Sequence, residues 1–289
     1  SQGGKRLRPV LLLAGCDLFD GDCEQAINAA IGIEIFHNFT LLHDDIMDKS
    51  PMRRGKETVY KRWNENIAIL SGDTMFALAY RYFLNTPHKN LHQILQVFTE
   101  TAIDVCNGQQ YDMNFETQSD ISMDEYLTMI RKKTAVLLAG ALKMGSLYGK
   151  CTKSDSDRFY NFGINVGMAF QLQDDLLDAF GDEKTFGKKI GGDILCGKRT
   201  FLLIQTLKKC GVSQRQTISQ LLKNTDIAGE EKIATIIDIY TQMEMPAVCT
   251  EAMEEYYAKA MATLAKINKT DEEKAPFVEF AKNLMGRID

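Results

Sequence analysis

Two short segments of the chain each carry three aspartates at the same spacing. "LLHDDIMD" spans residues 41–48 and "QLQDDLLD" spans residues 171–178, and both continue an apolar run. On an α-helix the first and third aspartates of such a cluster lie one turn apart, and the middle one is rotated by about 100°. One cluster alone is typical of a solvated helix end, whereas a matched pair favours metal binding. The members are Asp44, Asp45 and Asp48, and Asp174, Asp175 and Asp178.

The chemistry of these clusters indicates a hard divalent cation. Carboxylate oxygens are the ligands that such ions prefer, and Mg²⁺ commonly binds one or two protein carboxylates together with water and substrate phosphate. Ionised carboxylates this close repel one another, and the C-terminal end of a helix is already a negative pole. A cation is therefore expected at each cluster. If the two helices face each other, the carboxylates would surround the mouth of an apolar interior.

Basic residues occur in short, separate motifs that could bind phosphate groups. Arg offers a planar fork for two phosphate oxygens and Lys a point charge, although each motif alone is more typical of a solvated surface. A net charge of −5 argues against general nucleic-acid binding, which depends on a surplus of Lys and Arg. The motifs are "GGKRLRP" at 3–9, "RRG" at 53–55, "RKKT" at 131–134 and "GKK…GKRT" at 187–200.

Composition is typical of a globular protein. The 289 residues are 45% hydrophobic and 25% charged, and no apolar run approaches the length of about 20 residues that a membrane span needs. We therefore predict a cytoplasmic protein without an integral membrane segment. The seven cysteines are scattered and form no CxxC pair, which favours reduced, mostly buried thiols over disulfides or a zinc site.

Apolar spacings of three and four residues recur along nearly the whole chain and predict an all-α fold without strands. The breaks are short, so we predict one domain over residues 1–289, with an N-terminal helix that could be absent from this sequence. The predicted helices span about 8–20, 24–48, 59–85, 90–116, 123–149, 155–181, 194–210, 213–226, 231–245, 247–267 and 272–287.

Six motifs in this order resemble the trans-isoprenyl diphosphate synthases, also called polyprenyl synthetases. They are "GGKRLRP", "LLHDDIMD…RRG", "GQQYD", "KT", "FQLQDDLLD" and "GKKIGGDILCGKRT", and they span about two thirds of the chain. The resemblance implies a bundle of about ten or more helices around a large central cavity, the isoprenoid synthase fold. It also implies a Mg²⁺-dependent prenyltransferase, in which an allylic diphosphate ionises and the double bond of isopentenyl diphosphate attacks head-to-tail.

The resemblance carries roles over to residues of this sequence. It implies that Asp44, Asp48 and Asp174 bind the metal, with Asp45, Asp175 and Asp178 in support. The positions implied to contact the allylic substrate are Arg53, Lys133, Thr134, Gln171, Lys188 and Lys198. Those implied to hold isopentenyl diphosphate are Lys5, Arg8, His37 and Arg54. Gln109 and Asp112 are expected to support this site or to form a buried bond between helices.

Product length is set in this family by the depth of an apolar pocket below the first aspartate motif. The resemblance implies that Phe39, five residues before Asp44, is the floor of that pocket, with Phe36 one turn further down. The helical wheel alone does not select Phe39, and core packing of both rings is an alternative. The compact first motif and the non-aromatic Thr40 favour a geranylgeranyl product over farnesyl.

Two other functions are compatible with parts of the sequence. A terpene cyclase also ionises an allylic diphosphate, but it typically carries one aspartate-rich motif and no second diphosphate site like Lys5 and Arg8. A catalytically silent regulatory subunit would tend to have lost the aspartates. The resemblance further implies a homodimer. The small-residue spacing of Gly163 and Gly167 fits such a contact, and it fits packing within one chain equally well.

Overall fold

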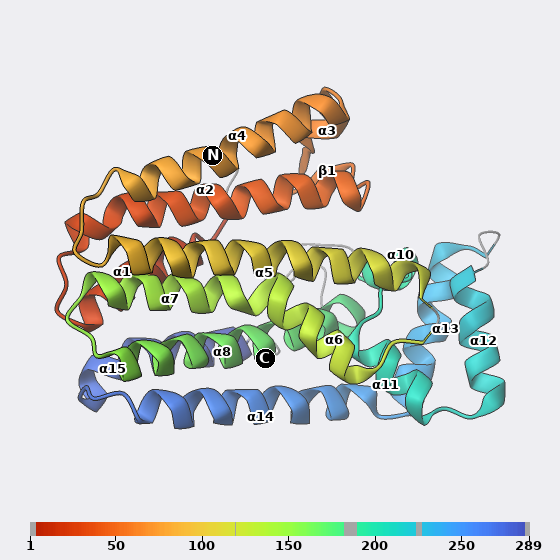
Figure 1. Cartoon of the computed structure of the whole chain (residues 1–289). Helices are drawn as coiled ribbons and strands as arrows, with labels where there is room; N and C mark the ends of the chain where they lie inside the picture. The colour runs from red at the N-terminus through yellow and green to blue at the C-terminus, as the bar shows by residue number, and fades with distance from the viewer. Residues whose placement is uncertain (1–3, 119, 182–189, 224–226, 287–289) are drawn as a thin grey trace. The chain divides into compact units, whose positions relative to one another are not determined.

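The computed structural model describes residues 4–118, 120–181, 190–223 and 227–286. Helices dominate this part of the chain (Figure 1), which confirms the predicted all-α fold. The helices are α1 (Leu7–Leu18), α2 (Cys23–Met47), α3 (Val59–Arg62), α4 (Glu65–Leu84), α5 (Leu91–Thr117), α6 (Met123–Ile130), the π-helical turn η1 (Arg131–Ala135), α7 (Val136–Tyr148), α8 (Lys153–Phe180), α10 (Gly192–Cys196), α11 (Phe201–Lys209), α12 (Val212–Lys223), α13 (Gly229–Gln242), α14 (Met245–Ala265) and α15 (Asp271–Met285).

Three predicted helices are interrupted, each for a local reason. The helix predicted at 59–85 divides into α3 and α4 because the Asn64 side chain accepts a hydrogen bond from Ile67 N at 2.9 Å and starts a new helix. The helix predicted at 194–210 divides into α10 and α11 at Gly197, where φ is 66°. The helix predicted at 123–149 contains η1 between α6 and α7.

The prediction that the chain has no strand is wrong. β1 (Met52–Arg53) pairs antiparallel with β2 (Lys56–Glu57), with Arg53 opposite Lys56. The connecting residues, Arg54 and Gly55, have φ values of 52° and 73°, as a type I′ hairpin turn requires. Strands of two residues carry no alternating pattern, so periodicity cannot reveal them. The hairpin fixes the position of Arg53 just after α2.

The chain divides into two compact units, and the first contains the described residues of 1–104, 136–163 and 266–273. Within it α2 packs along α4, and α1 packs along α7 (Figure 1). The second pair is very close, because a Cβ added at Gly145 would lie only 2.0 Å from Leu12 O. Gly163 of α8 likewise lies against Ala139 of α7. The close packing at Gly163 is therefore a contact within one chain.

The second unit contains the described residues of 105–135, 164–265 and 274–289. Helix α11 contacts both α6 and α14, and fully buried Tyr126 lies within this unit. Gly167 of α8 lets that helix approach η1, because an added Cβ would lie 2.6 Å from Ala135 Cα. Gly167 therefore also serves packing within the chain. The single-domain organisation stays a prediction.

Two further sequence predictions concern membranes and cysteines. None of the helices in the described part of the chain combines the length and the apolar character that a membrane crossing requires. All seven cysteines are free thiols, but only Cys16 and Cys249 are buried. Cys106 and Cys196 are exposed, so the prediction that most of the thiols are buried is wrong.

Candidate active site

The first aspartate cluster ends helix α2 in the first unit. Asp44 and Asp45 lie in its last turn, and Asp48 is the C-cap residue, whose N–H donates to Asp44 O at 2.8 Å. Asp44 and Asp48 are half-buried, whereas Asp45 is only 6% exposed. Burial raises the pKa of Asp45, although the neighbouring Arg53 opposes that shift. The middle aspartate thus has a different environment from the other two.

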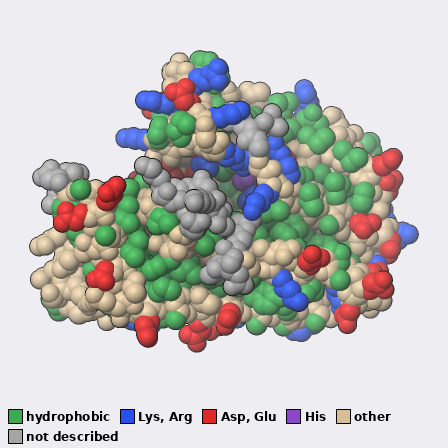
Figure 2. All heavy atoms as spheres, turned by 180° about the vertical axis from the view of Figure 1, so that it is seen from behind, with side chains coloured by type: hydrophobic (Ala, Val, Ile, Leu, Met, Phe, Trp, Pro, Cys, Tyr) green, Lys and Arg blue, Asp and Glu red, His purple; other side chains and the backbone are tan. Residues whose placement is uncertain are grey.

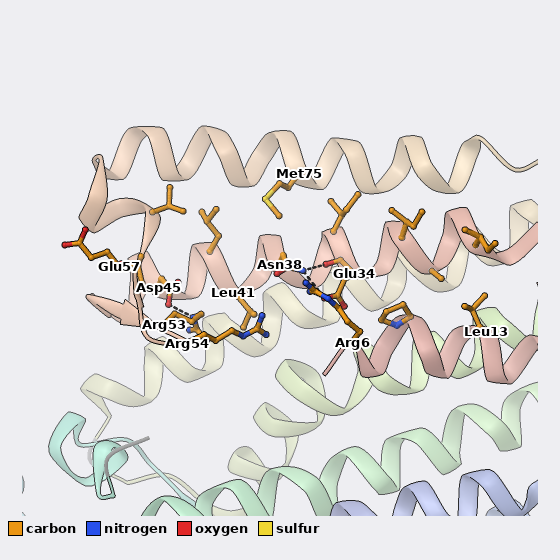
Figure 3. Close-up of a pocket in the computed structure, with 18 residues that line it drawn as sticks. Arg6, Leu13, Glu34, Asn38, Leu41, Asp45, Arg53, Arg54, Glu57 and Met75 are labelled. Carbon is orange, nitrogen blue, oxygen red and sulfur yellow. Dashed lines mark hydrogen bonds and ion pairs between the residues drawn. The ribbon is translucent and has the colours of Figure 1, made fainter. Parts of the chain in front are cut away.

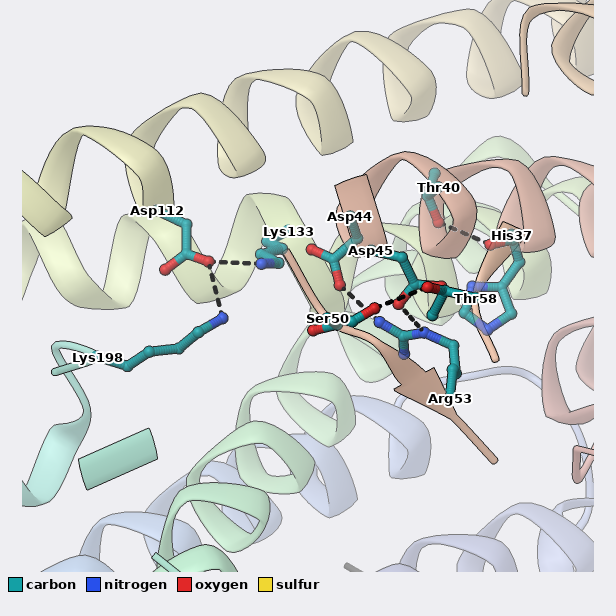
Figure 4. A network of polar contacts seen from close by, with 10 residues as sticks. All are labelled: His37, Thr40, Asp44, Asp45, Ser50, Arg53, Thr58, Asp112, Lys133 and Lys198. Atoms are coloured by element: carbon teal, nitrogen blue, oxygen red, sulfur yellow. Dashed lines mark hydrogen bonds and ion pairs between the residues drawn. The ribbon is translucent and has the colours of Figure 1, made fainter. Parts of the chain in front are cut away.

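Arg53 supplies the cation that this cluster was predicted to need. Its Nε donates to Asp45 Oδ1 at 2.6 Å, and its second terminal nitrogen donates to Asp44 Oδ2 at 3.0 Å (Figure 4). One guanidinium therefore bridges two neighbouring carboxylates, which is the geometry that favours Arg over Lys. Lys56 on β2 and Lys61 and Arg62 on α3 are exposed as well. Figure 2 shows several Lys and Arg side chains near the top of the face that it draws.

A cavity of about 620 Å³ lies beside α2 in the same unit (Figure 3). Asp45, Arg53 and Arg54 line one end of it, and an ion pair between Arg6 and Glu34 lies further along. The remaining lining is mostly apolar. Phe36 and Phe39, which the sequence predicts to limit the product pocket, do not line this cavity. Asn38 also lines it, and its amide donates to Glu34 Oε1. The apolar lining residues include Leu13, Ile27, Ile31 and Met75.

The structure brings together most of the residues predicted to hold isopentenyl diphosphate. A terminal nitrogen of Arg8 donates to His37 Nε2 at 3.0 Å, because a guanidinium has only donors. Burial lowers the pKa of His37 to about 2, and the charges of Arg8 and Arg54 add to the shift. The imidazole is therefore neutral. The Arg54 guanidinium lies beside Gly4, where an added Cβ would be 2.7 Å from it, and Lys5 follows as an exposed residue.

Phe36 and Phe39 belong to an aromatic cluster between α2 and α4. The Phe39 ring stacks on Phe76 of α4, with centroids 5.1 Å apart and planes at 13°. Phe36 also contacts Phe76, at 5.6 Å, and Phe98 of α5 at 5.2 Å. Phe76 was not among the predicted site residues, although residues 76, 80 and 83 share one face of a helix. Any floor formed by Phe39 is thus a stacked pair of rings.

The second aspartate cluster lies on α8 in the second unit, and its middle and third members are buried. Asp175 is 5% exposed and accepts three hydrogen bonds, from Tyr126 Oη at 2.5 Å, Phe201 N at 2.9 Å and Gln171 Nε2 at 3.1 Å. Burial raises the pKa of Asp175 to about 6, while these bonds favour the ionised form. Asp174 is half-buried. Tyr126 was not among the predicted site residues.

The third aspartate of this cluster holds the start of helix α10. Asp178 Oδ2 accepts a hydrogen bond from Asp193 N at 3.0 Å, and its backbone oxygen accepts one from Gly191 N at 2.6 Å. Burial raises the pKa of Asp193 to about 7, and the charges of Asp178 and Asp175 contribute further. Asp193 was also missed, although it lies in the "GGD" of the last basic motif. Four acidic side chains therefore gather in this unit.

Lys133 and Lys198 meet at Asp112. Lys133 Nζ donates to Asp112 Oδ2 at 2.5 Å, and Lys198 Nζ lies 3.7 Å from the same oxygen (Figure 4). Burial works against ionisation of Asp112, but the two lysines outweigh it and lower its pKa. Gly108, one turn earlier on α5, allows this contact because an added Cβ would lie 2.3 Å from Lys133 N.

The π-helical turn η1 carries the remaining predicted substrate residues. It presents Lys133 and Thr134, and Thr134 Oγ1 donates to Gln171 Oε1 at 2.9 Å. Insertions of this kind in an α-helix occur frequently at functional sites. Lys188, which the sequence also predicts to contact the allylic substrate, lies outside the described residues. The second unit therefore contains Lys133, Thr134, Gln171 and Lys198, and their contact with a substrate stays a prediction.

The donor chemistry of both clusters fits a hard divalent cation. In the described ranges no group of three or more His, Cys, Asp or Glu side chains is arranged to hold a metal ion by itself. Mg²⁺ does not need such a cage, because it usually keeps several waters and binds one or two carboxylates together with substrate phosphate. Asp44 and Asp48, one helical turn apart and half-buried, provide two such carboxylates.

Comparison with known proteins identifies the family. The family model described as polyprenyl synthetase matches residues 1–240. A geranylgeranyl diphosphate synthase of Sulfolobus acidocaldarius is 36% identical over 276 residues, which cover 94% of this chain and 83% of that protein. The crystal structure of a geranylgeranyl pyrophosphate synthase superposes with a TM-score of 0.94 at 41% identity, covering 100% of this chain and 89% of that one. A polyprenyl synthase from Caulobacter crescentus, crystallised with calcium and isoprenyl diphosphate, gives a TM-score of 0.90 at 28% identity, covering 100% and 86%. With two complete aspartate clusters and these similarities, the chain belongs to the polyprenyl synthetase family.

Proposed function

We propose that this protein is a prenyltransferase that condenses isopentenyl diphosphate head-to-tail with an allylic diphosphate. The observation that carries the proposal is that both aspartate clusters are complete, while cationic side chains lie in the same unit as each of them. The carbon–oxygen bond of the allylic diphosphate breaks and its electron pair leaves with the diphosphate. The double bond of isopentenyl diphosphate then forms the new carbon–carbon bond, and loss of a proton restores an allylic product.

The chain's own residues bind and orient the leaving diphosphate. In the second unit Lys133 and Lys198, held by Asp112, supply positive charge. In the first unit the guanidinium of Arg53, which bridges Asp44 and Asp45, supplies a further positive charge. A bound Mg²⁺ would stabilise the negative charge that develops on the diphosphate. We assign metal binding to Asp44 and Asp48 in the first unit and to Asp174 in the second. The calcium and isoprenyl diphosphate in the crystal structure of the Caulobacter crescentus relative support a divalent ion here.

We assign Lys5, Arg8, His37 and Arg54 to isopentenyl diphosphate. A neutral His37 can accept from Arg8 through Nε2 and still donate through Nδ1, so it can contribute a hydrogen bond without adding charge. Arg8 and Arg54 provide the positive charge that a diphosphate needs. Because isopentenyl diphosphate must stay intact during the reaction, residues without a metal are suited to hold it.

We propose a short product, with geranylgeranyl favoured over farnesyl. Phe39 lies five residues before Asp44 on α2, and its ring stacks on Phe76 of α4, so the pair is suited to form the floor of a product pocket. The same contacts are also ordinary core packing, so the length of the product is the measurement that separates the two interpretations. A Phe39→Ala variant should extend the product by at least one isoprene unit if the ring is a floor.

We further propose a homodimer in the cytoplasm. The first two turns of helix α4 expose three large apolar side chains, Ile67, Ile69 and Leu70, of which Leu70 is 66% exposed. Contiguous exposed apolar residues on one helix are typical of an interface between subunits. Sedimentation analysis of the protein and of a Leu70→Glu variant tests this proposal, because the charge should separate the dimer into monomers.

A product assay tests the proposed reaction. Purified protein, Mg²⁺, isopentenyl diphosphate and each allylic diphosphate in turn are incubated, and the dephosphorylated products are sized by chromatography. Metal-dependent elongation that ends at geranylgeraniol supports the proposal. Cyclic hydrocarbons would indicate a terpene cyclase, and failure with every starter would favour a silent regulatory subunit. Asp44→Asn should abolish turnover, whereas Asp73→Asn, at an exposed aspartate of α4, should not.

A further inference from the structure

The Gln171 side chain links two other residues of the second unit. Its Nε2 donates to Asp175 Oδ1 at 3.1 Å, and its Oε1 accepts from Thr134 Oγ1 at 2.9 Å. A carboxylate only accepts hydrogen bonds, so the amide must turn its NH₂ group to Asp175 and its oxygen to Thr134. The orientation of Asp175 therefore decides which hydrogen-bonding atoms of Gln171 and Thr134 remain for a substrate.

Asp175 is itself held by donors from two other helices. Tyr126 of α6 donates its hydroxyl to Oδ2 at 2.5 Å, and Phe201 N, at the start of α11, donates to the same oxygen at 2.9 Å. Tyr126 is 1% exposed and Asp175 is 5% exposed, so water cannot readily reach Asp175 to replace a lost donor. A buried carboxylate that loses a donor can regain a partner only by rotating.

We propose that Tyr126 is a positioning residue that acts through Asp175 to fix the amide of Gln171 and the hydroxyl of Thr134. The inference rests on the proposed function and on the predicted contact of Gln171 and Thr134 with the allylic substrate. Tyr126 does not touch that substrate itself. Its hydroxyl keeps Asp175 Oδ1 directed at Gln171, and this contact keeps the Thr134 hydroxyl hydrogen directed at Gln171 Oε1.

The Tyr126→Phe variant isolates this effect, because it removes one hydroxyl and keeps the buried ring. Asp175 Oδ2 then keeps only the Phe201 N–H among the two donors described here. Misplacement of groups at a reacting centre lowers kcat more than it weakens binding, and we expect kcat to fall by about tenfold to a hundredfold. Metal and cationic residues still bind the diphosphate, so KM should change by less than about threefold.

The kinetic test is a double-mutant cycle with Tyr126→Phe and Gln171→Leu. If Tyr126 acts through Gln171, Tyr126→Phe should change kcat by less than about twofold in the Gln171→Leu background. Multiplicative losses in the double variant, or a wild-type kcat in Tyr126→Phe, would overturn the inference. The matched control is Tyr240→Phe, at a tyrosine of the same unit that is 2% exposed and is not among the three donors to Asp175 named above. Its kcat should stay close to that of the wild type.

A second measurement does not depend on activity. In ¹⁵N-labelled protein the side-chain amide signals of Gln171 can be assigned by their absence from the Gln171→Leu variant. Tyr126→Phe should shift both signals, and Tyr240→Phe should leave them in place. Unshifted signals would refute the inference even in an inactive protein. If Tyr126→Phe shifts the signals but the wild-type protein elongates no substrate, the proposed function is refuted. The link between Tyr126 and Gln171 is then still established.

Discussion

Replacement of Gly108 by alanine should damage activity far more than stability. The added Cβ would lie 2.3 Å from Lys133 N, 2.7 Å from Lys132 C and 2.7 Å from Lys133 Cα. All three are backbone atoms, so no side-chain rotation can relieve the overlap. Helix α5 and the π-helical turn η1 must therefore move apart, and Lys133 moves with the turn.

The size of the effect follows from these distances. Ordinary contact of a Cβ begins at 3.4 Å, so the two backbones must separate by about 1 Å. Lys133 Nζ lies 2.5 Å from Asp112 Oδ2, one turn beyond Gly108, and the same displacement would bring this bond close to its limit of about 3.5 Å. Overpacking costs about 1–3 kcal/mol, and the better helix propensity of alanine offsets about 1 kcal/mol. A misplacement of about 1 Å at a catalytic group can lower kcat about a hundredfold.

The assay compares kcat and urea unfolding for Gly108→Ala and for Gly211→Ala. Gly211 has no atom within 4 Å of an added Cβ, so its variant should keep its kcat and change the free energy of unfolding by at most about 0.5 kcal/mol. We expect Gly108→Ala to lose about 0–2 kcal/mol of stability and a large part of its turnover. A wild-type kcat in Gly108→Ala would refute the claim that close approach of α5 positions Lys133.

Three other changes have defined outcomes. Arg53→Gln removes the cation that bridges Asp44 and Asp45, so it should lower the free energy of unfolding by about 2 kcal/mol. Added Mg²⁺ should raise the urea midpoint of this variant more than that of the wild type. An equal response of both proteins would contradict this prediction. His37 has its pKa lowered from 6.5 to about 2 by burial and nearby arginines, so its stabilising effect is complete above pH 6.5 and is lost as the pH falls towards 2. Urea unfolding of His37→Gln between pH 6 and 4 should therefore show a slope smaller by up to about 1.4 kcal/mol per pH unit, and an unchanged slope would contradict the shift. Phe76→Ala should lengthen the prenyl product, as we also expect for Phe39→Ala, because the two rings stack. Products of unchanged length would exclude Phe76 from the floor of the product pocket.

The helices could be predicted from the sequence because their apolar spacing is a property of single segments. The predicted ends mostly agree with the observed ones to within a few residues, as for α2, predicted at 24–48 and observed at Cys23–Met47. The hairpin could not be predicted, because it consists of two residues on each strand. The π-helical turn could not be predicted either, since Gly108 and Gly167 from two other helices press against it.

The candidate site was predictable where a motif is local and unpredictable where contacts are distant. The family, the all-α fold and the prenyltransferase class are confirmed by the comparisons, whereas the roles of individual residues stay predictions. Tyr126 and Asp175 are 49 residues apart, and the segment around Tyr126 has no pattern that indicates a hydrogen-bond donor to a carboxylate. The pairing of Arg53 with Asp44 was implied only in general terms, by the expectation of a cation at a negative helix end.

The two aspartate clusters have one spacing, and each keeps its middle carboxylate ionisable by different means. Asp45 meets the full positive charge of Arg53, whereas Asp175 accepts hydrogen bonds from three uncharged donors. Both are buried, and helical geometry turns each of them about 100° away from its neighbours in the motif. A buried carboxylate that is fully hydrogen-bonded has little capacity left for a metal ion. The middle aspartates therefore hold the ends of their helices to other elements, and we propose that the half-buried Asp44, Asp48 and Asp174 bind metal.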